Sequence, residues 1–252
     1  MGAMIELIVD ALKNFAVQII VVVLLVVALR RSKFLRSLFG TYKKLTEGDS
    51  ESNTNLTEEE RTELELLRSE KQMRELQNNA GAGDAKSQYI LGNKHYKDGN
   101  YTEAVKWYRK AAAQGHIYAT HNLGNAYYNG RGVEQDYSEA FRFYRIAADK
   151  GYAQSQYFLG NEYYNGKKLF TRNYEEAFKW YRKAAEQGHA KAQCNLGNLY
   201  QNGLGVEKNY VEAAKWYRKA INNNDDEARE SAAKKLDALQ KRLHEIQEAL
   251  RH

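Results

Sequence analysis

Proline is absent from this 252-residue sequence, and cysteine occurs only once, at Cys194. A chain without proline has lost its commonest helix breaker and must end its helices with glycine, asparagine or aspartate. The absence therefore favours an all-helical fold. A single cysteine excludes an intramolecular disulfide and favours a reducing compartment.

The signatures of catalysis are also missing. The sequence has no Walker loop, no dinucleotide-binding glycine motif, no nucleophile elbow and no histidine–cysteine cluster with metal-ligand spacing. Its six histidines are scattered. We therefore expect a protein that is not an enzyme and that uses no cofactor and no metal. An enzyme is the alternative class, and a pair of buried carboxylates with shifted pKa values would favour it.

The net charge of +6 is unevenly placed along the chain. One basic block lies near the N-terminus, residues 47–70 are mostly acidic, and the remainder is mixed; the block contains Arg30, Arg31, Lys33, Arg36, Lys43 and Lys44. A nucleic-acid-binding protein more often carries a basic face through its folded part, so we predict no nucleic-acid partner. The block directly follows an apolar segment, which indicates a membrane surface.

That apolar segment runs from Leu12 to Leu29, and its central part has only Gln18 as a polar residue. Eighteen helical residues span roughly 27 Å, close to the thickness of the hydrocarbon core of a bilayer. A buried core helix and a cleaved signal peptide are the alternatives. A signal peptide needs a positive start and a cleavage site after the run, whereas here Arg30 and Arg31 follow it. We predict an uncleaved single-pass anchor within residues 1–36.

The orientation of this anchor follows from the distribution of basic residues. Four of them lie within seven positions after the apolar run, against Lys13 before it. The positive-inside rule then places the C-terminal side in the cytoplasm. The predicted location is a membrane, with the bacterial inner membrane as the best match.

A polar linker and a charged helix make up residues 37–83. Residues 40–55 are typical of a flexible tether. Thr57 and Glu60 then form a capping box that predicts a helix over residues 58–77, broken by the glycine-containing segment 78–83. The apolar residues of this helix form a narrow stripe: Leu64, Leu67, Met73 and Leu76. Two interpretations stay open, a cap or partner helix and a solvated spacer.

Two signatures recur with nearly the same period in residues 84–225. Leu-Gly-Asn occurs at residues 91–93, 123–125, 159–161 and 196–198. An aromatic pair occurs at residues 107–108, 143–144, 180–181 and 216–217. Two independent signatures with spacings of 32 to 37 residues establish four repeats.

Each repeat reads as two helices joined by a turn. The first helix contains Leu-Gly-Asn, and the second begins near Tyr-x-Glu-Ala and ends at Gly115, Gly151 or Gly188. Alanines and aromatic pairs fall on one face of the second helix, so we assign Trp and Tyr to the core. The glycine after each leucine is expected to leave room for a ring of the paired helix. One unit cannot bury its apolar face alone, so the repeats must stack into an all-α solenoid.

The repeats resemble the Sel-one-like repeat family, which is related to tetratricopeptide repeats. The match is best from Leu196 to Ala220, including Gly203, Gly205 and Val206, and the second repeat matches nearly as well. The third repeat departs at residues 167–169, and the first lacks four loop residues. The resemblance implies an adaptor or scaffold that binds protein or peptide partners, and analogy with helical-pair solenoids implies a right-handed superhelix.

In related solenoids the first helices line the concave surface. Positions three before, one after and four after the shared glycine form one stripe along each first helix. These positions are Tyr89, Asn93, Tyr96, His121, Asn125, Tyr128, Tyr157, Asn161, Tyr164, Cys194, Asn198 and Gln201. Asparagine amides can pair with an extended peptide backbone, and tyrosines supply contact area. The alternative is that the asparagines only bond between neighbouring repeats.

Residues 226–252 predict a long last helix. Ala232, Leu236, Leu239, Leu243, Ile246 and Leu250 form a heptad seam. The first half should cap the solenoid, and the second half either continues this cap or permits self-association. The predicted function is a membrane-tethered adaptor, and the alternative is a structural or regulatory subunit of a membrane complex held by its anchor.

Overall fold

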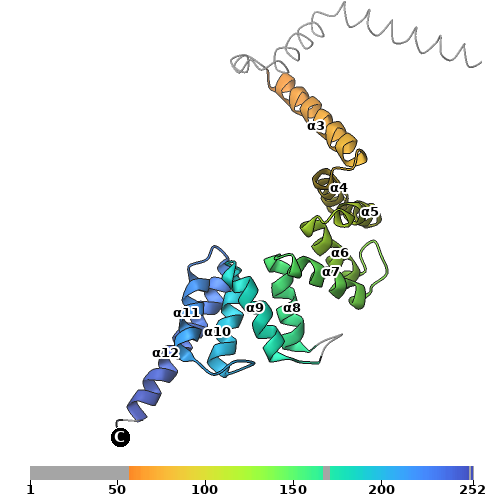
Figure 1. Cartoon of the computed structure of the whole chain (residues 1–252). Helices are drawn as coiled ribbons and strands as arrows, with labels where there is room; N and C mark the ends of the chain where they lie inside the picture. The colour runs from red at the N-terminus through yellow and green to blue at the C-terminus, as the bar shows by residue number, and fades with distance from the viewer. Residues whose placement is uncertain (1–56, 167–170, 250, 252) are drawn as a thin grey trace, which may run out of the picture. The chain divides into compact units, whose positions relative to one another are not determined.

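A computed structural model describes residues 57–166, 171–249 and 251 of the chain. Every regular element in these ranges is an α-helix (Figure 1), which confirms the all-α part of the predicted fold class. The predicted anchor, its basic flank, the linker and residues 167–169 of the third repeat lie outside the described residues. None of the described helices is long and apolar enough to cross a membrane.

The chain divides into two units, residues 1–74 and residues 75–252. The second unit holds the predicted repeats as four pairs of helices, in which each first helix packs on the second helix that follows it. The second helix of each of the first three pairs also packs on the first helix of the next pair. The pairs are α4 (Ala85–Lys97) with α5 (Tyr101–Ala113), α6 (Ile117–Asn129) with α7 (Tyr137–Asp149), α8 (Ala153–Asn165) with α9 (Tyr174–Glu186), and α10 (Ala190–Asn202) with α11 (Tyr210–Ile221).

The turns between helices follow the sequence prediction. Gly115, Gly151 and Gly188, which follow the second helices, have φ values of 85°, 93° and 88°. In the loop after α6, Gly132 has a φ of 76°, and a Cβ there would lie 2.3 Å from the carbonyl oxygen of Tyr101. This loop therefore lies directly on the start of α5, and only glycine allows that approach.

The glycine of each Leu-Gly pair makes room for a tyrosine ring of the paired helix, as the sequence predicts. A Cβ added at Gly160 would lie 2.5 Å from the ring of Tyr181, and one at Gly124 would lie 2.7 Å from the ring of Tyr144. Gly92 and Gly197 have the same relation to Tyr108 and Tyr217. The four tyrosines are consequently buried between the helices of each pair.

The two members of the aromatic pair differ in burial in the first, second and fourth repeats, and both are buried, as the sequence predicts, only in the third. Trp180 is buried, but Trp107 and Trp216 are only half-buried. A lysine three residues later lies over each tryptophan ring, with Lys110 4.3 Å from the ring centre of Trp107. The four tyrosines and Trp180 therefore belong to the core, whereas Trp107 and Trp216 lie at its outer edge under basic side chains.

Two longer helices flank the repeats. Helix α3 (Glu58–Gly81) does not end at residue 77 as predicted but continues to Gly81. Its end is tied to α4, because the buried Gln88 amide donates to the carbonyl of Ala80 at 3.0 Å. Its apolar stripe residues are half-buried.

Helix α12 (Asp226–Ala249) packs on α11 and α10 as the predicted cap. Ala232 and Leu239 are buried, Leu236 and Leu243 are half-buried against the same cluster, and Ile246 is 41% exposed. The seam therefore docks on the solenoid as far as Leu243.

We predict that Gly160→Ala lowers the free energy of unfolding by about 1–3 kcal/mol, because the new methyl group overlaps the ring of Tyr181. Urea or thermal unfolding of the purified protein measures the change. Gly81→Ala is the matched control. A Cβ at Gly81 meets nothing within 4 Å, so that variant should be neutral or slightly stabilising. Equal stability of Gly160→Ala and the wild type would contradict the packing role.

Candidate functional site

The asparagine row is bonded to the buried tyrosines. The side-chain oxygens of Asn93, Asn125 and Asn161 each accept a hydrogen bond from the hydroxyl of the tyrosine in the paired helix. These hydroxyls belong to Tyr108, Tyr144 and Tyr181, at 2.8, 2.7 and 2.6 Å respectively. Burial raises the pKa of Tyr108 to about 12 and that of Tyr144 and Tyr181 further, so these hydroxyls stay protonated donors.

The fourth repeat uses a different acceptor. Here the hydroxyl of Tyr217 donates to Gln201 at 2.6 Å. Asn198 is thus released from this role, and its amide donates to the hydroxyl of Tyr164 in the preceding repeat at 3.3 Å. Gln201 therefore has the structural role that asparagine has in the first three repeats.

The asparagine row also bonds between some neighbouring repeats. The amide of Asn122 donates to the oxygen of Asn93 at 3.1 Å, and that of Asn195 donates to the oxygen of Asn161 at 3.4 Å. Between the second and third repeats Phe158 takes this position, with its ring centre 3.9 Å from that of Tyr144. These contacts support the interpretation that the side-chain oxygens of the asparagines stabilise the fold. Within the described part of the chain, however, nothing accepts a hydrogen bond from the amide nitrogens of Asn93, Asn125 or Asn161.

The tyrosines of the stripe are half-buried and lie against other aromatic rings. Tyr89 stacks on His116 at 4.6 Å between ring centres, and Tyr157 stacks on His189 at 4.5 Å. Both histidines cap the next first helix, because Nδ1 accepts from a backbone N–H three residues later. Tyr96, Tyr128 and Tyr164 meet the first tyrosine of their paired second helix edge-on.

His121 and Cys194 depart from the predicted stripe because both are buried. Nδ1 of His121 lies 2.8 Å from the hydroxyl of Ser155 in the next repeat, and burial lowers the pKa of His121 to about 4. His121 therefore contributes little exposed surface to the stripe in which the sequence places it. Its ring fills the space between two repeats.

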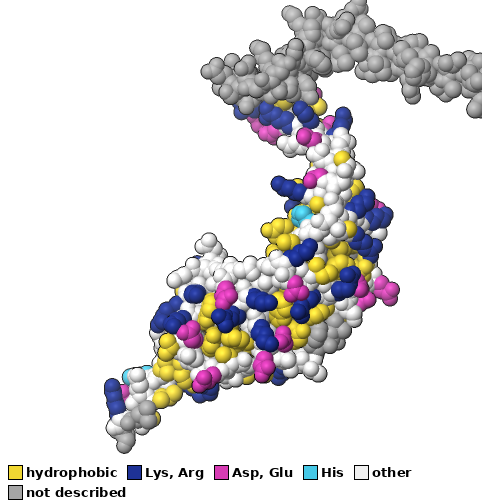
Figure 2. All heavy atoms as spheres, in the orientation of Figure 1, with side chains coloured by type: hydrophobic (Ala, Val, Ile, Leu, Met, Phe, Trp, Pro, Cys, Tyr) yellow, Lys and Arg dark blue, Asp and Glu magenta, His cyan; other side chains and the backbone are white. Residues whose placement is uncertain are grey.

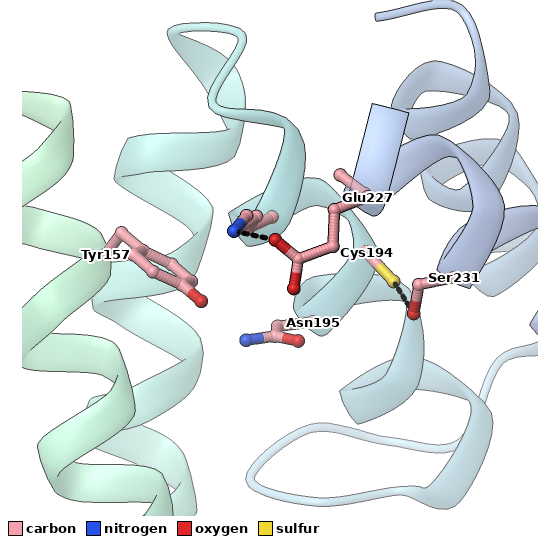
Figure 3. A pocket seen from close by; sticks show the side chains of 7 residues that line it. Tyr157, Cys194, Asn195, Glu227 and Ser231 are labelled. Carbon is pink, nitrogen blue, oxygen red and sulfur yellow. Dashed lines mark hydrogen bonds and ion pairs between the residues drawn. The ribbon is translucent and has the colours of Figure 1, made fainter. Parts of the chain in front are cut away.

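A pocket opens where α8, α10 and α12 meet, at the last of the four first helices along the chain. Its volume is about 130 Å³, and Tyr157, Lys191, Cys194, Asn195, Glu227, Ala228 and Ser231 line it. Figure 3 shows the side chains of Tyr157, Asn195 and Glu227 converging on this space from three different helices. Lys191 and Glu227 form an ion pair at the pocket. The sequence stripe predicted Tyr157 and Cys194 but not the contribution of α12.

The second helices carry a different surface. Each has a glutamate in its first turn that pairs with a basic residue three positions later, as in Glu103 with Lys106. In the face that Figure 2 shows, hydrophobic side chains over the repeats lie in small patches separated by residues of both charges. Among the described residues, no group of three His, Cys, Asp or Glu side chains is arranged to hold a metal ion.

The family model for the Sel1 repeat matches four successive segments, residues 85–116, 117–152, 153–189 and 190–225. These segments cover more than half of the chain. This chain belongs to the Sel1 repeat family. Sel1 repeat proteins typically mediate protein–protein interactions and act as scaffolds. The four segments coincide with the four pairs of helices.

Two solved structures resemble this Sel1 repeat protein. A protective antigen of uropathogenic Escherichia coli that displays an SLR fold is 40% identical over 62% of this chain, with a TM-score of 0.57. A Sel1 repeat protein from Oxalobacter formigenes is 30% identical over 61% of this chain, also with a TM-score of 0.57. The alignments cover 34% and 45% of those two proteins. Among curated proteins, none is similar enough to be counted as a relative.

Sequence reasoning missed a second set of polar contacts, near the start of three first helices. Buried Gln88, Gln156 and Gln193 each donate to a carbonyl eight residues earlier, in the last turn of the preceding helix. Gln114 and Gln187 in turn donate to Gln88 and Gln156. The sequence feature that could have revealed these contacts is a glutamine at the same position of three repeats, three residues before the leucine of Leu-Gly.

We predict that acidification destabilises the protein partly through His121. Its folded-state pKa of about 4 lies below the ordinary value of 6.5, so the unfolded state binds the proton first. The stabilisation is complete above pH 6.5 and is lost as the pH falls towards 4. By pH 5 the loss amounts to about 2 kcal/mol from His121 alone.

Urea unfolding at pH 7.5 and pH 5 measures this effect, with His121→Gln as the comparison. The variant should lose less stability on acidification than the wild type does. Some pH dependence will remain, because burial also lowers the pKa of His116 and His189. If His121→Gln and the wild type lost the same stability between pH 7.5 and pH 5, His121 would not be the cause of the effect.

Proposed function

We propose that this protein is a membrane-tethered adaptor whose first helices bind an extended peptide segment of a protein partner. The binding surface is the concave face of a right-handed superhelix formed by α4, α6, α8 and α10. The anchor in residues 1–36 would hold this surface on the cytoplasmic side of a membrane. The proposal extends the protein-interaction role that is typical of Sel1 repeat proteins.

One observation carries the proposal: the asparagine oxygens are used by the fold while the amide nitrogens are not. The tyrosine hydroxyls fix each carboxamide by its oxygen. A carboxamide has two N–H donors, and a donor that is held in place loses little entropy when it binds a peptide carbonyl. Three such donors at successive repeats fit the repeating carbonyls of an extended chain.

The tyrosines beside this row supply the apolar part of the surface. Tyr89, Tyr96, Tyr128, Tyr157 and Tyr164 are half-buried, so each still offers part of its ring. Their stacking on histidines and other tyrosines fixes the rings before a ligand arrives. Rigid aromatic side chains give contact area at a low entropic cost, which is typical of protein-binding surfaces.

We expect Asn125→Asp with Asn161→Asp to abolish partner capture and to leave the fold intact. Aspartate keeps an oxygen that accepts from Tyr144 and Tyr181, but it replaces the N–H donors with a charged acceptor. Affinity capture from solubilised membranes, quantified by mass spectrometry, measures binding, and circular dichroism measures folding.

The matched control is Tyr144→Phe with Tyr181→Phe, which removes the hydroxyls and keeps both amides. That variant should lose about 0.5–1.5 kcal/mol of stability for each hydrogen bond and still capture the partner. Aspartate variants that capture the partner as well as the wild type does would show that the asparagine row serves only the fold.

The tether makes a separate prediction. Deletion of residues 1–36 should move the protein from the membrane fraction to the soluble fraction, while the remaining chain keeps its binding. In the alternative, a subunit held in a membrane complex by its anchor, the same deletion removes all partners. Protease added after disruption of only an outer membrane should leave the repeats intact, and their digestion would contradict the cytoplasmic orientation.

A further inference from the structure

The pocket between α8, α10 and α12 is rich in hydrogen-bond donors. Lys191 provides an ammonium group, Asn195 an amide, and Tyr157 and Ser231 provide hydroxyls. Glu227 is the one carboxylate among the residues that line the pocket. Such a set of donors fits an anionic group with several acceptor oxygens.

A carboxylate of the chain itself already occupies part of this site. Glu227 accepts a hydrogen bond from Lys191, and this bond raises the pKa of the lysine. The side chain of Glu227 is 81% exposed, whereas that of Lys191 is 37% exposed. The carboxylate therefore lies at the mouth of the pocket, and the ammonium lies deeper. An ion pair with such an exposed partner contributes little free energy, so another carboxylate can replace Glu227 at little cost.

The charges around the pocket support this exchange. Lys235 lies against Cys194, with its Nζ 3.6 Å from the sulfur. Asp225 is engaged as the cap of α12, because it accepts from the backbone N–H of Ala228 at 2.9 Å. Two cations and two anions thus balance while Glu227 is in place, and its withdrawal leaves a net positive charge for an incoming anion.

We propose that this pocket binds a carboxylate of the peptide that lies along the first helices, in place of the carboxylate of Glu227. The inference rests on the proposed function and adds the chemistry of one anchoring group. Tyr157 and Asn195 connect the pocket to the asparagine row, since the amide of Asn195 donates to Asn161. A peptide on that row therefore reaches the pocket directly. The carboxylate comes either from a peptide C-terminus or from an Asp or Glu side chain.

Three pools of random twelve-residue peptides separate these sources, applied to the immobilised full-length chain in detergent micelles. The first pool has free C-termini and no Asp or Glu, the second has amidated C-termini and contains Asp and Glu, and the third is amidated and lacks both residues. We expect retention of the first or the second pool, whichever supplies the carboxylate, and weak retention of the third. Equal retention of all three would overturn the inference.

Two variants should change the affinity for the retained peptides in opposite directions. Lys191→Gln removes the principal donor and should weaken binding about tenfold. Glu227→Gln removes the internal competitor and should strengthen binding about two- to fivefold. Lys86→Gln is the matched control, because Lys86 has the same position in the first repeat and does not line the pocket. It should change the affinity less than twofold.

The outcomes also distinguish this inference from the proposed function. Loss of binding in the Asn125→Asp and Asn161→Asp protein, with no effect of Lys191→Gln or Glu227→Gln, would leave the peptide-binding role standing and overturn the carboxylate pocket. A decrease in affinity in both pocket variants would show that the ion pair itself is needed, and would also overturn it. Failure to retain any pool would overturn both proposals.

Discussion

The hydrogen bond between a buried tyrosine hydroxyl and an asparagine or glutamine oxygen is the constraint on which each repeat depends. The ring of Tyr144 fits between two helices only because Gly124 has no side chain. Once buried, its hydroxyl needs an acceptor, since an unsatisfied buried donor costs about 1–3 kcal/mol. Asn125, the residue after that glycine, supplies the acceptor at 2.7 Å. In the Gly-Asn dipeptide, the glycine thus leaves room for the tyrosine ring and the asparagine accepts the hydrogen bond of its hydroxyl.

Because of this hydrogen bond, a structural role of the asparagine row does not exclude the proposed binding role. A carboxamide has an oxygen and a nitrogen with opposite hydrogen-bonding character. The fold uses the oxygen and thereby fixes the orientation of the nitrogen. In the fourth repeat a different residue accepts from the tyrosine, because Gln201 accepts from Tyr217 while the Asn198 amide bonds to Tyr164. In that repeat the amide of the asparagine supports the neighbouring repeat instead.

Much of the fold was predictable from the sequence because packing of repeated residues produces a repeated pattern. The period, the pairs of helices and the contact between glycine and ring all follow from residues that recur at the same position. The different burial of Trp107 and Tyr108 was not predictable in this way, since adjacent residues on one helical face share the same periodicity. The burial of His121 was equally unpredictable from the sequence. It depends on Ser155 in the next repeat, and no other repeat has a histidine at that position.

The candidate pocket was even harder to predict from the sequence, because it depends on an irregularity at the end of the repeats. Hydrogen bonds join each first helix to the first helix of the next repeat, whereas the last of them, α10, is followed by α12. This capping helix buries Ala228 and Ala232 on the solenoid, yet it places Glu227 beside Lys191 of α10. A cap is required because the last repeat would otherwise expose its apolar face. The same requirement brings a charged helix to the end of the asparagine row, so the end of the stack differs chemically from its middle. In the proposed binding mode, three equivalent amides would recognise a peptide backbone without fixing its register, and one charged pocket at the end of the row would be sufficient to fix it.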